Sequence, residues 1–244
     1  MREGKRADLF LVEHGFAASR AVARRAIDAG RVRIGGLQIA KASQLVPEGA
    51  EVTYSAAYNY VSRGAIKLAA ALDEFRLSPA GDICLDIGAS TGGFTQLLLE
   101  RGARRVYAVD VGHGQLHASL HGDPRIKAIE GCNARDLTAE RIGDRVDSIV
   151  ADVSFISLKL ALPPALELAR DGAWLVALVK PQFEVGRAII GKGGIVRDSG
   201  AREAALRGIA DWLPTVGWSV SGTMESPIAG GSGNREYLLA ARKT

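Results

Sequence analysis

The stretch CLDIGASTGGF, residues 84–94, decides the fold class of this chain, together with RRVYAVDVGHG at residues 104–114. In the first, an apolar run predicts a buried strand, and the glycines after it predict a tight turn that a ligand can approach closely. In the second, another apolar run ends in Asp110, where a carboxylate can bind both hydroxyls of a ribose. The glycine spacing differs from G-x-G-x-x-G, so the ligand is either a nucleoside bearing a carboxylate or a dinucleotide.

The remainder of the chain after residue 82 alternates between apolar runs and helical patterns. Strands are predicted at 83–87, 106–110, 126–129, 147–152 and 173–179, and helices at 94–101, 113–121 and 157–170. Two segments with alternating polar and apolar residues close the chain, at 218–226 and 235–243. We therefore expect parallel βα units closed by an antiparallel pair, with the ligand at the carboxyl ends of the strands.

Composition limits the class of protein. The chain has 244 residues, of which 47% are hydrophobic, and 29 glycines, which fits an α/β protein of one or two domains. No apolar run approaches the ~20 residues of a membrane span, and no signal-type apolar core follows the charged beginning MREGKRADLF. Two cysteines, Cys84 and Cys132, are too few for a disulfide framework. We expect a cytoplasmic protein without a membrane anchor.

Residues 1–55 are expected to form a small separate domain, followed by a linker over 56–62. Helical periodicity covers 7–14 and 19–29, and a short sheet is expected after them. The whole chain has a net charge of only +4, but this domain carries a cluster of arginines. Such a cluster is usually a solvated face, yet its concentration in a small domain indicates an anionic polymer as partner.

A family resemblance becomes specific at this point. The segment LDIGASTGGFTQLLLERGARRVYAVDVGHGQL resembles the S-adenosylmethionine site of FtsJ-like class I methyltransferases. Within them the chain is most similar to the TlyA family, also labelled haemolysin A, which joins an S4 RNA-binding domain to such a methyltransferase. The S4 domain is matched by DLFLVEHGFAASRAVARRAIDAGRVRI, the junction by YVSRGAIKL, and later signatures by ADVSFISL, LVKPQFEVGR, KGGIVRD and GNREYLL. Two departures are RIGG in place of a Val-Asn-Gly turn and SRGA in place of SRGG.

The resemblance implies a fold, a cofactor and a partner. Residues 63–244 would form a Rossmann-like class I methyltransferase domain that binds S-adenosylmethionine, and residues 1–55 a small α/β S4-type domain that binds RNA. The cofactor's ribose would contact Asp110, and its adenine would be flanked by Asn133. Its methionine end would contact Gly88, Ser90, Gly92, Gly93 and Phe94. From the arginine cluster of this domain, we expect the RNA to be bound by Arg6, Arg20, Arg24 and Arg31.

Methyl transfer to a ribose 2′-hydroxyl needs a positioned hydroxyl and a group that removes its proton. A lysine held out of bulk water near another cation loses proton affinity and can act as that base, while carboxylates hold the lysine and orient the hydroxyl. Lys180 is a candidate because a charged side chain directly after a largely apolar strand indicates a specific role. It belongs to a set that resembles the catalytic tetrad of FtsJ-like 2′-O-methyltransferases: Lys67, Asp152, Lys180 and Glu236.

The acceptor is expected to be a ribose rather than a base. DVSF at 152–155 lacks both prolines of the DPPY motif found in enzymes that methylate exocyclic base nitrogens. The resemblance implies a cytidine ribose in ribosomal RNA, with the RNA or a ribosomal subunit as partner and a monomer as the expected state. Family members with short tails are associated with the large subunit alone, and eight residues follow Glu236, so the large subunit is favoured and the small subunit stays open.

Other interpretations share part of this pattern. A nicotinamide dehydrogenase has the same strand, turn and Asp110 but needs no tetrad. A membrane-active protein follows from the haemolysin label, but the sequence offers no strongly amphipathic apolar helix. An inactive methyltransferase fold that only binds RNA is opposed by the complete tetrad. His113, His117 and His121 have helical spacing, and because no cysteine or carboxylate cluster completes a metal site, we expect a helix face and no metal.

Overall fold

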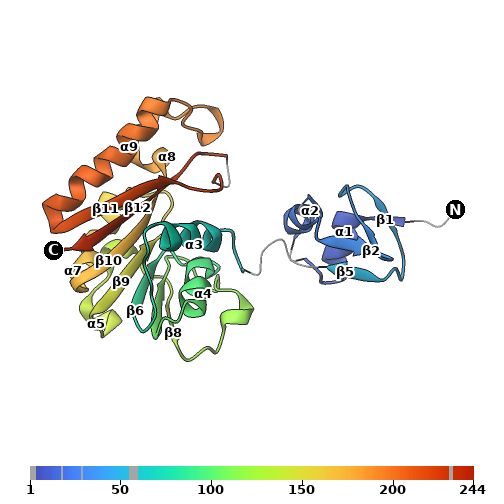
Figure 1. Cartoon of the computed structure of the whole chain (residues 1–244), viewed down its shortest axis with the longest axis horizontal. Coiled ribbons are helices and arrows are strands. Elements are labelled where there is room, and N and C mark those ends of the chain that lie inside the picture. The colour runs from blue at the N-terminus through green and yellow to red at the C-terminus, as the bar shows by residue number, and fades with distance from the viewer. Residues whose placement is uncertain (1–3, 18, 29, 55–59, 231–232) are drawn as a thin grey trace. The chain divides into compact units, whose positions relative to one another are not determined.

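The computed structural model describes residues 4–17, 19–28, 30–54, 60–230 and 233–244, and contacts divide the chain into two units, Met1–Asn59 and Tyr60–Thr244 (Figure 1). The boundary was expected at residue 55, with a linker over 56–62, and residues 55–59 lie outside the described part of the chain. Tyr60 packs on the hydrophobic core of the larger unit. The larger unit thus includes the last residues of the expected linker.

The smaller unit contains two short helices and two small sheets. The helices expected at 7–14 and 19–29 are confirmed, although residue 29 lies outside the described residues. Strand β1 pairs antiparallel with β4, and β2 lies between β3 and β5. Buried side chains of both helices and of β4 meet in one core, which includes Phe10, Leu11, Ile27 and Val46. Its elements are β1 (Gly4–Arg6), α1 (Ala7–Glu13), α2 (Arg20–Asp28), β2 (Val32–Ile34), β3 (Leu37–Gln38), β4 (Leu45–Pro47) and β5 (Val52–Tyr54).

The larger unit alternates between strands and helices. Its strands are β6 (Ile83–Ile87), β7 (Arg105–Val109), β8 (Ile126–Ile129), β9 (Val146–Ala151), β10 (Ala169–Val179), β11 (Trp218–Glu225) and β12 (Tyr237–Lys243). Its α-helices are α3 (Gly64–Glu74), α4 (Gly93–Glu100), α5 (Ala139–Ile142), α6 (Leu158–Ala161), α7 (Pro163–Glu167), α8 (Pro181–Glu184) and α9 (Ser199–Trp212). Its 3₁₀ helices are η1 (Ala118–Leu120), η2 (Ala134–Asp136), η3 (Arg187–Ile189), η4 (Lys192–Gly194) and η5 (Leu213–Val216).

The strands of the larger unit form one sheet in the order β11-β12-β10-β9-β6-β7-β8. The neighbours from β10 to β8 pair in parallel, whereas β12 pairs antiparallel with both β10 and β11. The predicted parallel sheet with an antiparallel closing pair is therefore confirmed. The chain moves from β6 outward to β8 and then returns to β9 on the other side of β6. The strand order thus reverses between β6 and β9, and this is where open α/β sheets bind ligands.

Alternating side chains bury both faces of this sheet. Leu85 and Ile87 of β6 pack in the core that includes Leu158 of α6 and Ile209 of α9. Cys84, the residue before Leu85, points to the opposite face and belongs to a second core with residues of α3 and α4, and these helices lie together beside β6 in Figure 1. Both faces of the central strand are thus buried, which is typical of a parallel sheet covered by helices on its two sides.

Two of the predicted helices are wrong. The segment 113–121 contains only the short η1, because Gly114 takes a left-handed conformation (φ 62°) and interrupts the pattern. The segment 157–170 is two short helices, α6 and α7, and its last residues already belong to β10. Pro163 begins the second of these helices, and a proline removes the backbone donor that a continuous helix would need. Helix α9 was not predicted.

Candidate active site

A pocket of about 1110 Å³ lies at the carboxyl ends of the central strands. Its walls come from the turns that follow β6, β7 and β9 and from the segment after β10. Four of the residues predicted from the sequence to bind the cofactor line it: Gly88, Ser90, Asp110 and Asn133. Asp152 of the predicted tetrad lines it as well. The pocket occupies the position at which the strand order reverses.

Gly88 allows the turn after β6 to approach the end of β9 closely. Its φ is 84°, and a Cβ built there would lie 2.6 Å from the carbonyl oxygen of Asp152. The neighbouring backbone is held in place, since the Asp152 N–H donates to the carbonyl oxygen of Ile87 at 2.9 Å. Any side chain at this position would therefore displace the end of β9. The glycine is required by the fold of the turn itself, before any ligand is considered.

Asp110 connects the turn after β6 with the turn after β7. Its Oδ2 accepts the backbone N–H of Ser90 at 2.8 Å, and its Oδ1 accepts that of Gly112 at 2.7 Å. Ser90 supplies its N–H from a left-handed conformation, with φ of 48°. A carboxylate has about four acceptor positions, so Asp110 can accept further hydrogen bonds from a diol in the pocket. Its donors fix the carboxylate, and its free capacity fits the ribose of a nucleoside cofactor.

The other predicted cofactor residues divide into two groups. Asn133 caps η2, with its Oδ1 accepting the Arg135 N–H at 3.1 Å, and it faces the pocket. Gly92, Gly93 and Phe94 are buried instead. A Cβ at Gly93 would lie 2.0 Å from Ser62 Oγ, and Phe94 is 3% exposed among core residues of α3 and α4. These last three are not among the residues that line the pocket, and their contact with the cofactor stays a prediction.

Lys180 and Asp152 form the first pair of the predicted tetrad. Lys180 directly follows β10, Asp152 directly follows β9, and their Nζ and Oδ1 atoms are 2.6 Å apart. Lys180 Nζ also donates to Ser154 Oγ at 2.9 Å. Ser154 lines the pocket and was not selected from the sequence, where a serine after a strand carries little signal. The cation is thereby held at the pocket by two side chains from the same turn.

Lys67 and Glu236 form the second pair. Lys67 of α3 and Glu236, the residue before β12, lie 2.5 Å apart between Nζ and Oε2. In the sheet, Val179 pairs with Tyr237, so Lys180 and Glu236 are the next residues of two paired strands. The structure therefore brings together three tetrad members at the ends of β9, β10 and β12, and α3 supplies the fourth. Within each pair the charges compensate one another.

Asp86 is a buried carboxyl beneath the glycine turn that sequence reasoning did not select. It lies in β6, is fully buried, and accepts the Thr95 hydroxyl at 2.6 Å. Burial raises its pKa to about 7, and the negative charges of Asp152 and Asp110 add to the shift. The signal in the sequence was a charged residue inside the apolar run ICLDI. A group that titrates near neutral pH thus lies below the pocket.

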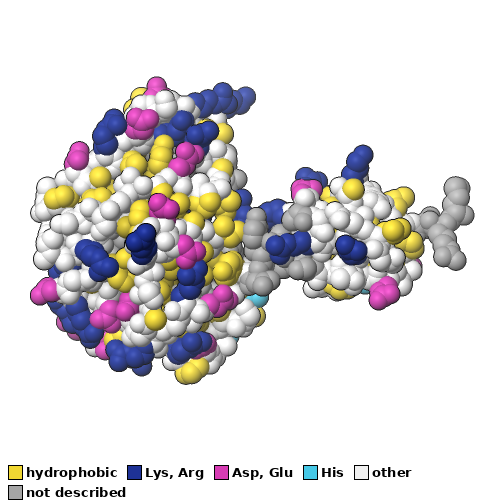
Figure 2. Space-filling model, viewed as in Figure 1, with side chains coloured by type: hydrophobic (Ala, Val, Ile, Leu, Met, Phe, Trp, Pro, Cys, Tyr) yellow, Lys and Arg dark blue, Asp and Glu magenta, His cyan; other side chains and the backbone are white. Residues whose placement is uncertain are grey.

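The arginines predicted to bind RNA lie in the smaller unit, and two of them share an ion-pair partner. Arg6 and Arg20 form ion pairs with Asp8, at 2.9 Å in each case. Arg24, one turn after Arg20 on α2, and Arg31 are both exposed. Figure 2 shows Lys and Arg side chains spread over the visible face of this unit. Asp8 was not selected from the sequence, because nothing local shows that an acidic residue serves two arginines.

Two of the histidines with helical spacing make local contacts in the segment around η1. His117 Nδ1 lies 2.9 Å from Ser119 Oγ, and His121 Nε2 lies 2.9 Å from the carbonyl oxygen of Leu116. Because no helix spans 113–121, these side chains do not share a helix face. That part of the prediction is wrong.

Among the described residues, no helix is both long and apolar enough to cross a membrane.

Two family models match the chain. The model of the FtsJ-like methyltransferases matches residues 60–243, and that of the S4 domain matches residues 5–52. These matches cover most of the larger and most of the smaller unit. They decide between the two interpretations of the glycine turn, because a nicotinamide dehydrogenase does not belong to this family.

Relatives extend the match over the whole chain. A 16S/23S rRNA (cytidine-2′-O)-methyltransferase TlyA of Mycobacterium tuberculosis is 48% identical over 99% of this chain and 91% of its own length. A 23S rRNA (cytidine-2′-O)-methyltransferase TlyA of Campylobacter jejuni is 40% identical over 73% of this chain and 69% of its own length. A solved structure from Streptococcus thermophilus, a hemolysin by name, has a TM-score of 0.77 and 41% identity and covers 100% of this chain and 90% of its own.

The residues that line the pocket fit the cofactor of this family. Gly88 leaves room for close approach, and Asp110 offers acceptors for a ribose diol. Asp152, Lys180 and Glu236 lie at the neighbouring strand ends, and Lys67 of α3 pairs with Glu236. The chain therefore belongs to the FtsJ-like methyltransferases, in the TlyA family that carries an N-terminal S4 domain, and S-adenosylmethionine is its cofactor.

Proposed function

We propose that this enzyme methylates the 2′-hydroxyl of a cytidine ribose in ribosomal RNA, with the large-subunit RNA as its main substrate in the cytoplasm. The observation that carries the proposal is the Lys180–Asp152 pair at the edge of the cofactor pocket, with Glu236 directly before the neighbouring strand β12. Lys180, Asp152 and Glu236 at strand ends, with Lys67 of α3 paired to Glu236, suit the alignment and deprotonation of a hydroxyl.

The chain's own residues supply binding, orientation and proton removal. S-adenosylmethionine supplies an activated methyl group when bound. Asp110 would hold the ribose of that cofactor, and Gly88 would allow its close approach to the backbone. Lys180 lies at hydrogen-bonding distance from both Asp152 and Ser154, which leaves its third N–H for the 2′-oxygen of the acceptor. A cation at that oxygen favours loss of the hydroxyl proton.

The proton has a nearby acceptor. Methylation of the acceptor requires its 2′-hydroxyl to lose a proton. The Lys180–Asp152 pair carries no net charge, so it can take up this proton without creating a doubly charged site. The Lys67–Glu236 pair is more deeply buried and is assigned a supporting role, in which it fixes the end of β12 beside Lys180.

The substrate class follows from the acceptor chemistry and from the named relatives. The tetrapeptide DVSF at 152–155 lacks the prolines of a DPPY motif, which favours a ribose over a base. The Mycobacterium tuberculosis and Campylobacter jejuni relatives are both named for cytidine 2′-O-methylation, and the substrate that their names share is 23S rRNA. This shared substrate supports the large subunit as the main target of this chain, with the small subunit as a second one.

The experiment uses unmodified large and small ribosomal subunits as separate substrates. The purified chain is incubated with each subunit and S-adenosylmethionine, and the RNA is digested to nucleosides for mass spectrometry. We expect 2′-O-methylcytidine in the large-subunit RNA. A methyl group on a base, or a methylated ribose on another nucleoside, would contradict the proposed chemistry. Methylation of the small subunit alone would contradict the proposed main substrate.

A further inference from the structure

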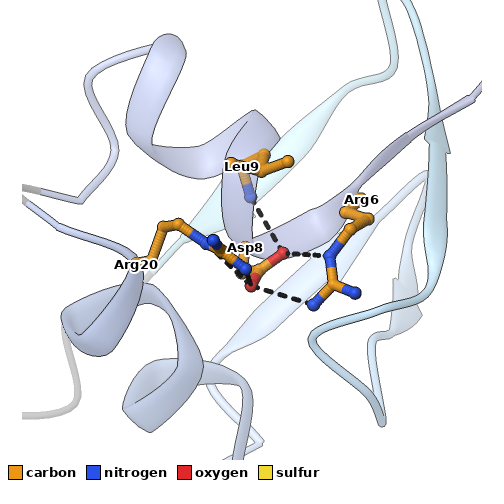
Figure 3. A network of polar contacts seen from close by, with 4 residues as sticks. All are labelled: Arg6, Asp8, Leu9 and Arg20. Atoms are coloured by element: carbon orange, nitrogen blue, oxygen red, sulfur yellow. Dashed lines mark hydrogen bonds and ion pairs between the residues drawn. The ribbon is translucent and has the colours of Figure 1, made fainter.

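We propose that Asp8 is a positioning residue for RNA binding, which holds the guanidinium groups of Arg6 and Arg20 as one rigid site for RNA phosphates. The inference rests on the proposed function, because it takes ribosomal RNA as the partner of the smaller unit. It concerns the described residues of that unit alone. Figure 3 shows the network, in which both arginines point toward the same carboxylate.

The Asp8 side chain joins three elements, because Arg6 ends β1, Asp8 lies in α1 and Arg20 begins α2. Asp8 lies in the first turn of α1, and its carboxylate is fully buried. Arg6 donates to it from Nε at 2.9 Å and from Nη2 at 3.1 Å. Arg20, the first residue of α2, donates from Nε at 3.2 Å and from Nη2 at 2.9 Å. The Leu9 backbone N–H adds a further bond at 3.1 Å, so the carboxylate is fully used within the unit.

Asp8 stays ionised while its partners stay accessible. The hydrogen bonds from Arg6, and then those from Arg20, hold the pKa of the Asp8 carboxyl well below its usual range, although burial opposes this shift. The side chains of the two arginines are 39% and 55% exposed, whereas that of Asp8 is 0% exposed. A ligand can therefore reach the guanidinium groups and cannot reach the carboxylate that orients them.

The network leaves donors and charge for an anion. A guanidinium carries about five N–H donors in a planar fork. Asp8 uses Nε and Nη2 of each arginine, so neither Nη1 contacts it. Two cations share one carboxylate, which leaves one positive charge uncompensated. Arginine forks match the geometry of phosphate oxygens, and side chains that are already ordered lose less rotamer entropy on binding.

Further basic side chains extend this site in the manner that a polyanion requires. Arg24 is exposed and lies one turn after Arg20 on α2, and residues four apart share a helix face. Arg33 is exposed on β2 of the same unit. Basic side chains are spread over the visible face of the unit in Figure 2 rather than collected in one pocket. A chain of phosphates fits this distribution better than a single small anion does.

A substitution of Asp8 separates positioning from net charge. Asp8→Asn removes a negative charge, so electrostatics alone predicts tighter RNA binding. If Asp8 positions the arginines, binding should become weaker despite the added positive charge. Asp28→Asn is the matched control, since Asp28 is an exposed residue of α2 and its replacement makes the same change in net charge.

The test measures affinity of the full chain for large ribosomal subunits and for a labelled double-stranded RNA, over a series of salt concentrations. For Asp8→Asn we expect about tenfold weaker binding, because two long side chains must then be ordered on binding. For Asp28→Asn we expect equal or slightly tighter binding. Thermal unfolding of each variant checks that the smaller unit stays folded.

A second variant keeps the proposal testable if Asp8→Asn does not fold. Arg20→Lys keeps the charge but lacks the fork that bonds Asp8 through two nitrogens, so we expect weaker binding with an almost unchanged salt slope. If Asp8→Asn is folded and binds as tightly as Asp28→Asn, or if Arg20→Lys binds as the unmodified chain does, the role of Asp8 is wrong while the proposed function stands. If the unmodified chain binds neither RNA, both proposals are overturned.

Discussion

Lys67 and Glu236 form a buried ion pair although 169 residues separate them in the chain. Their Nζ and Oε2 atoms are 2.5 Å apart, and the side chains are 8% and 3% exposed. Removing one partner of a buried pair leaves the other charge without compensation, which typically costs about 3–5 kcal/mol. Removing both partners together costs much less. The pair therefore links α3 to the end of β12 in a way that single substitutions should reveal.

We expect Lys67→Met and Glu236→Leu each to destabilise the larger unit by about 3–5 kcal/mol, and the double variant Lys67→Met/Glu236→Leu to be less destabilised than either. Urea unfolding followed by tryptophan fluorescence measures this, since all three tryptophans, Trp174, Trp212 and Trp218, lie in the larger unit. Additive effects of the two substitutions would contradict the pairing.

Lys180→Ala should leave cofactor binding intact and lower methyl transfer by ~10²–10⁴-fold. Lys180 is held at the pocket edge by Asp152 and Ser154, and it does not line the pocket itself. Single-turnover transfer to large ribosomal subunits measures the rate, and calorimetry with S-adenosylhomocysteine measures binding. Lys192→Ala is the control, because Lys192 is an exposed lysine of η4. A variant with near-normal turnover would remove Lys180 from the mechanism.

Asp110→Ala should weaken cofactor binding by roughly ten- to a hundredfold, since it removes acceptors for charge-assisted hydrogen bonds. It also leaves the backbone N–H groups of Ser90 and Gly112 without their acceptor, since both donate to the Asp110 carboxylate in the unmodified chain, at 2.8 and 2.7 Å. Calorimetry with S-adenosylhomocysteine gives the dissociation constant. Asp136→Ala, at an exposed residue of η2, should leave it unchanged. Equal affinity of the Asp110 variant would defeat its assignment to the ribose.

These relationships differ in how far the sequence could predict them. The glycine turn and Asp110 lie in one continuous segment, and strand ends in a parallel sheet meet at one edge, so their proximity followed from the pattern. Pairing of Lys67 with Glu236 depends on how α3 packs against β12, which no local pattern contains. Asp8 was missed for the same reason, since Arg20 comes from the next helix.

Errors of the opposite kind came from patterns that looked regular. Histidine spacing over 113–121 suggested a helix, but Gly112 and Gly114 flank His113 and the backbone at Gly114 is left-handed. Phe94 follows the glycine turn directly and is buried among core residues of α3 and α4, so its contact with the cofactor stays a prediction.

Asp86 predicts a pH dependence of stability. Burial raises its pKa to about 7 in the folded unit, whereas an unfolded aspartate has its ordinary value of 3.8. The folded state therefore holds the proton at pH values where the unfolded state has released it. This contribution is complete below about pH 4 and is lost as the pH rises to about 7. Above about pH 7, Asp86 is ionised in both the folded and the unfolded state, so the loss of stability no longer changes with pH.

Asp86→Asn cannot ionise and should not show this loss. We expect the variant to gain a few kcal/mol relative to the unmodified chain between about pH 4 and pH 8. Urea unfolding by tryptophan fluorescence at several pH values measures the difference. Asp171→Asn, at an exposed position of β10, is the control and should follow the unmodified chain. A constant difference between Asp86→Asn and the unmodified chain over this range would show that Asp86 is ionised throughout.

Division of the chain into two units predicts that cofactor binding and RNA binding can be separated. All residues that line the cofactor pocket belong to Tyr60–Thr244. The fragment should begin at Tyr60, because Tyr60 packs on the core and the Val61 N–H donates to Gln96 Oε1 at 2.8 Å. We expect this fragment to bind S-adenosylhomocysteine as the full chain does, measured by calorimetry.

The same fragment should methylate large ribosomal subunits poorly, because it lacks the arginines of the smaller unit. The loss should be largest at high salt, where the few remaining phosphate contacts of the fragment hold the RNA least well. Transfer of a labelled methyl group at several salt concentrations measures it, with the full chain as reference. If the fragment binds the cofactor normally and methylates as fast as the full chain at every salt concentration, then Met1–Asn59 does not hold the substrate. A fragment that fails to bind the cofactor would show instead that the larger unit does not form its pocket alone.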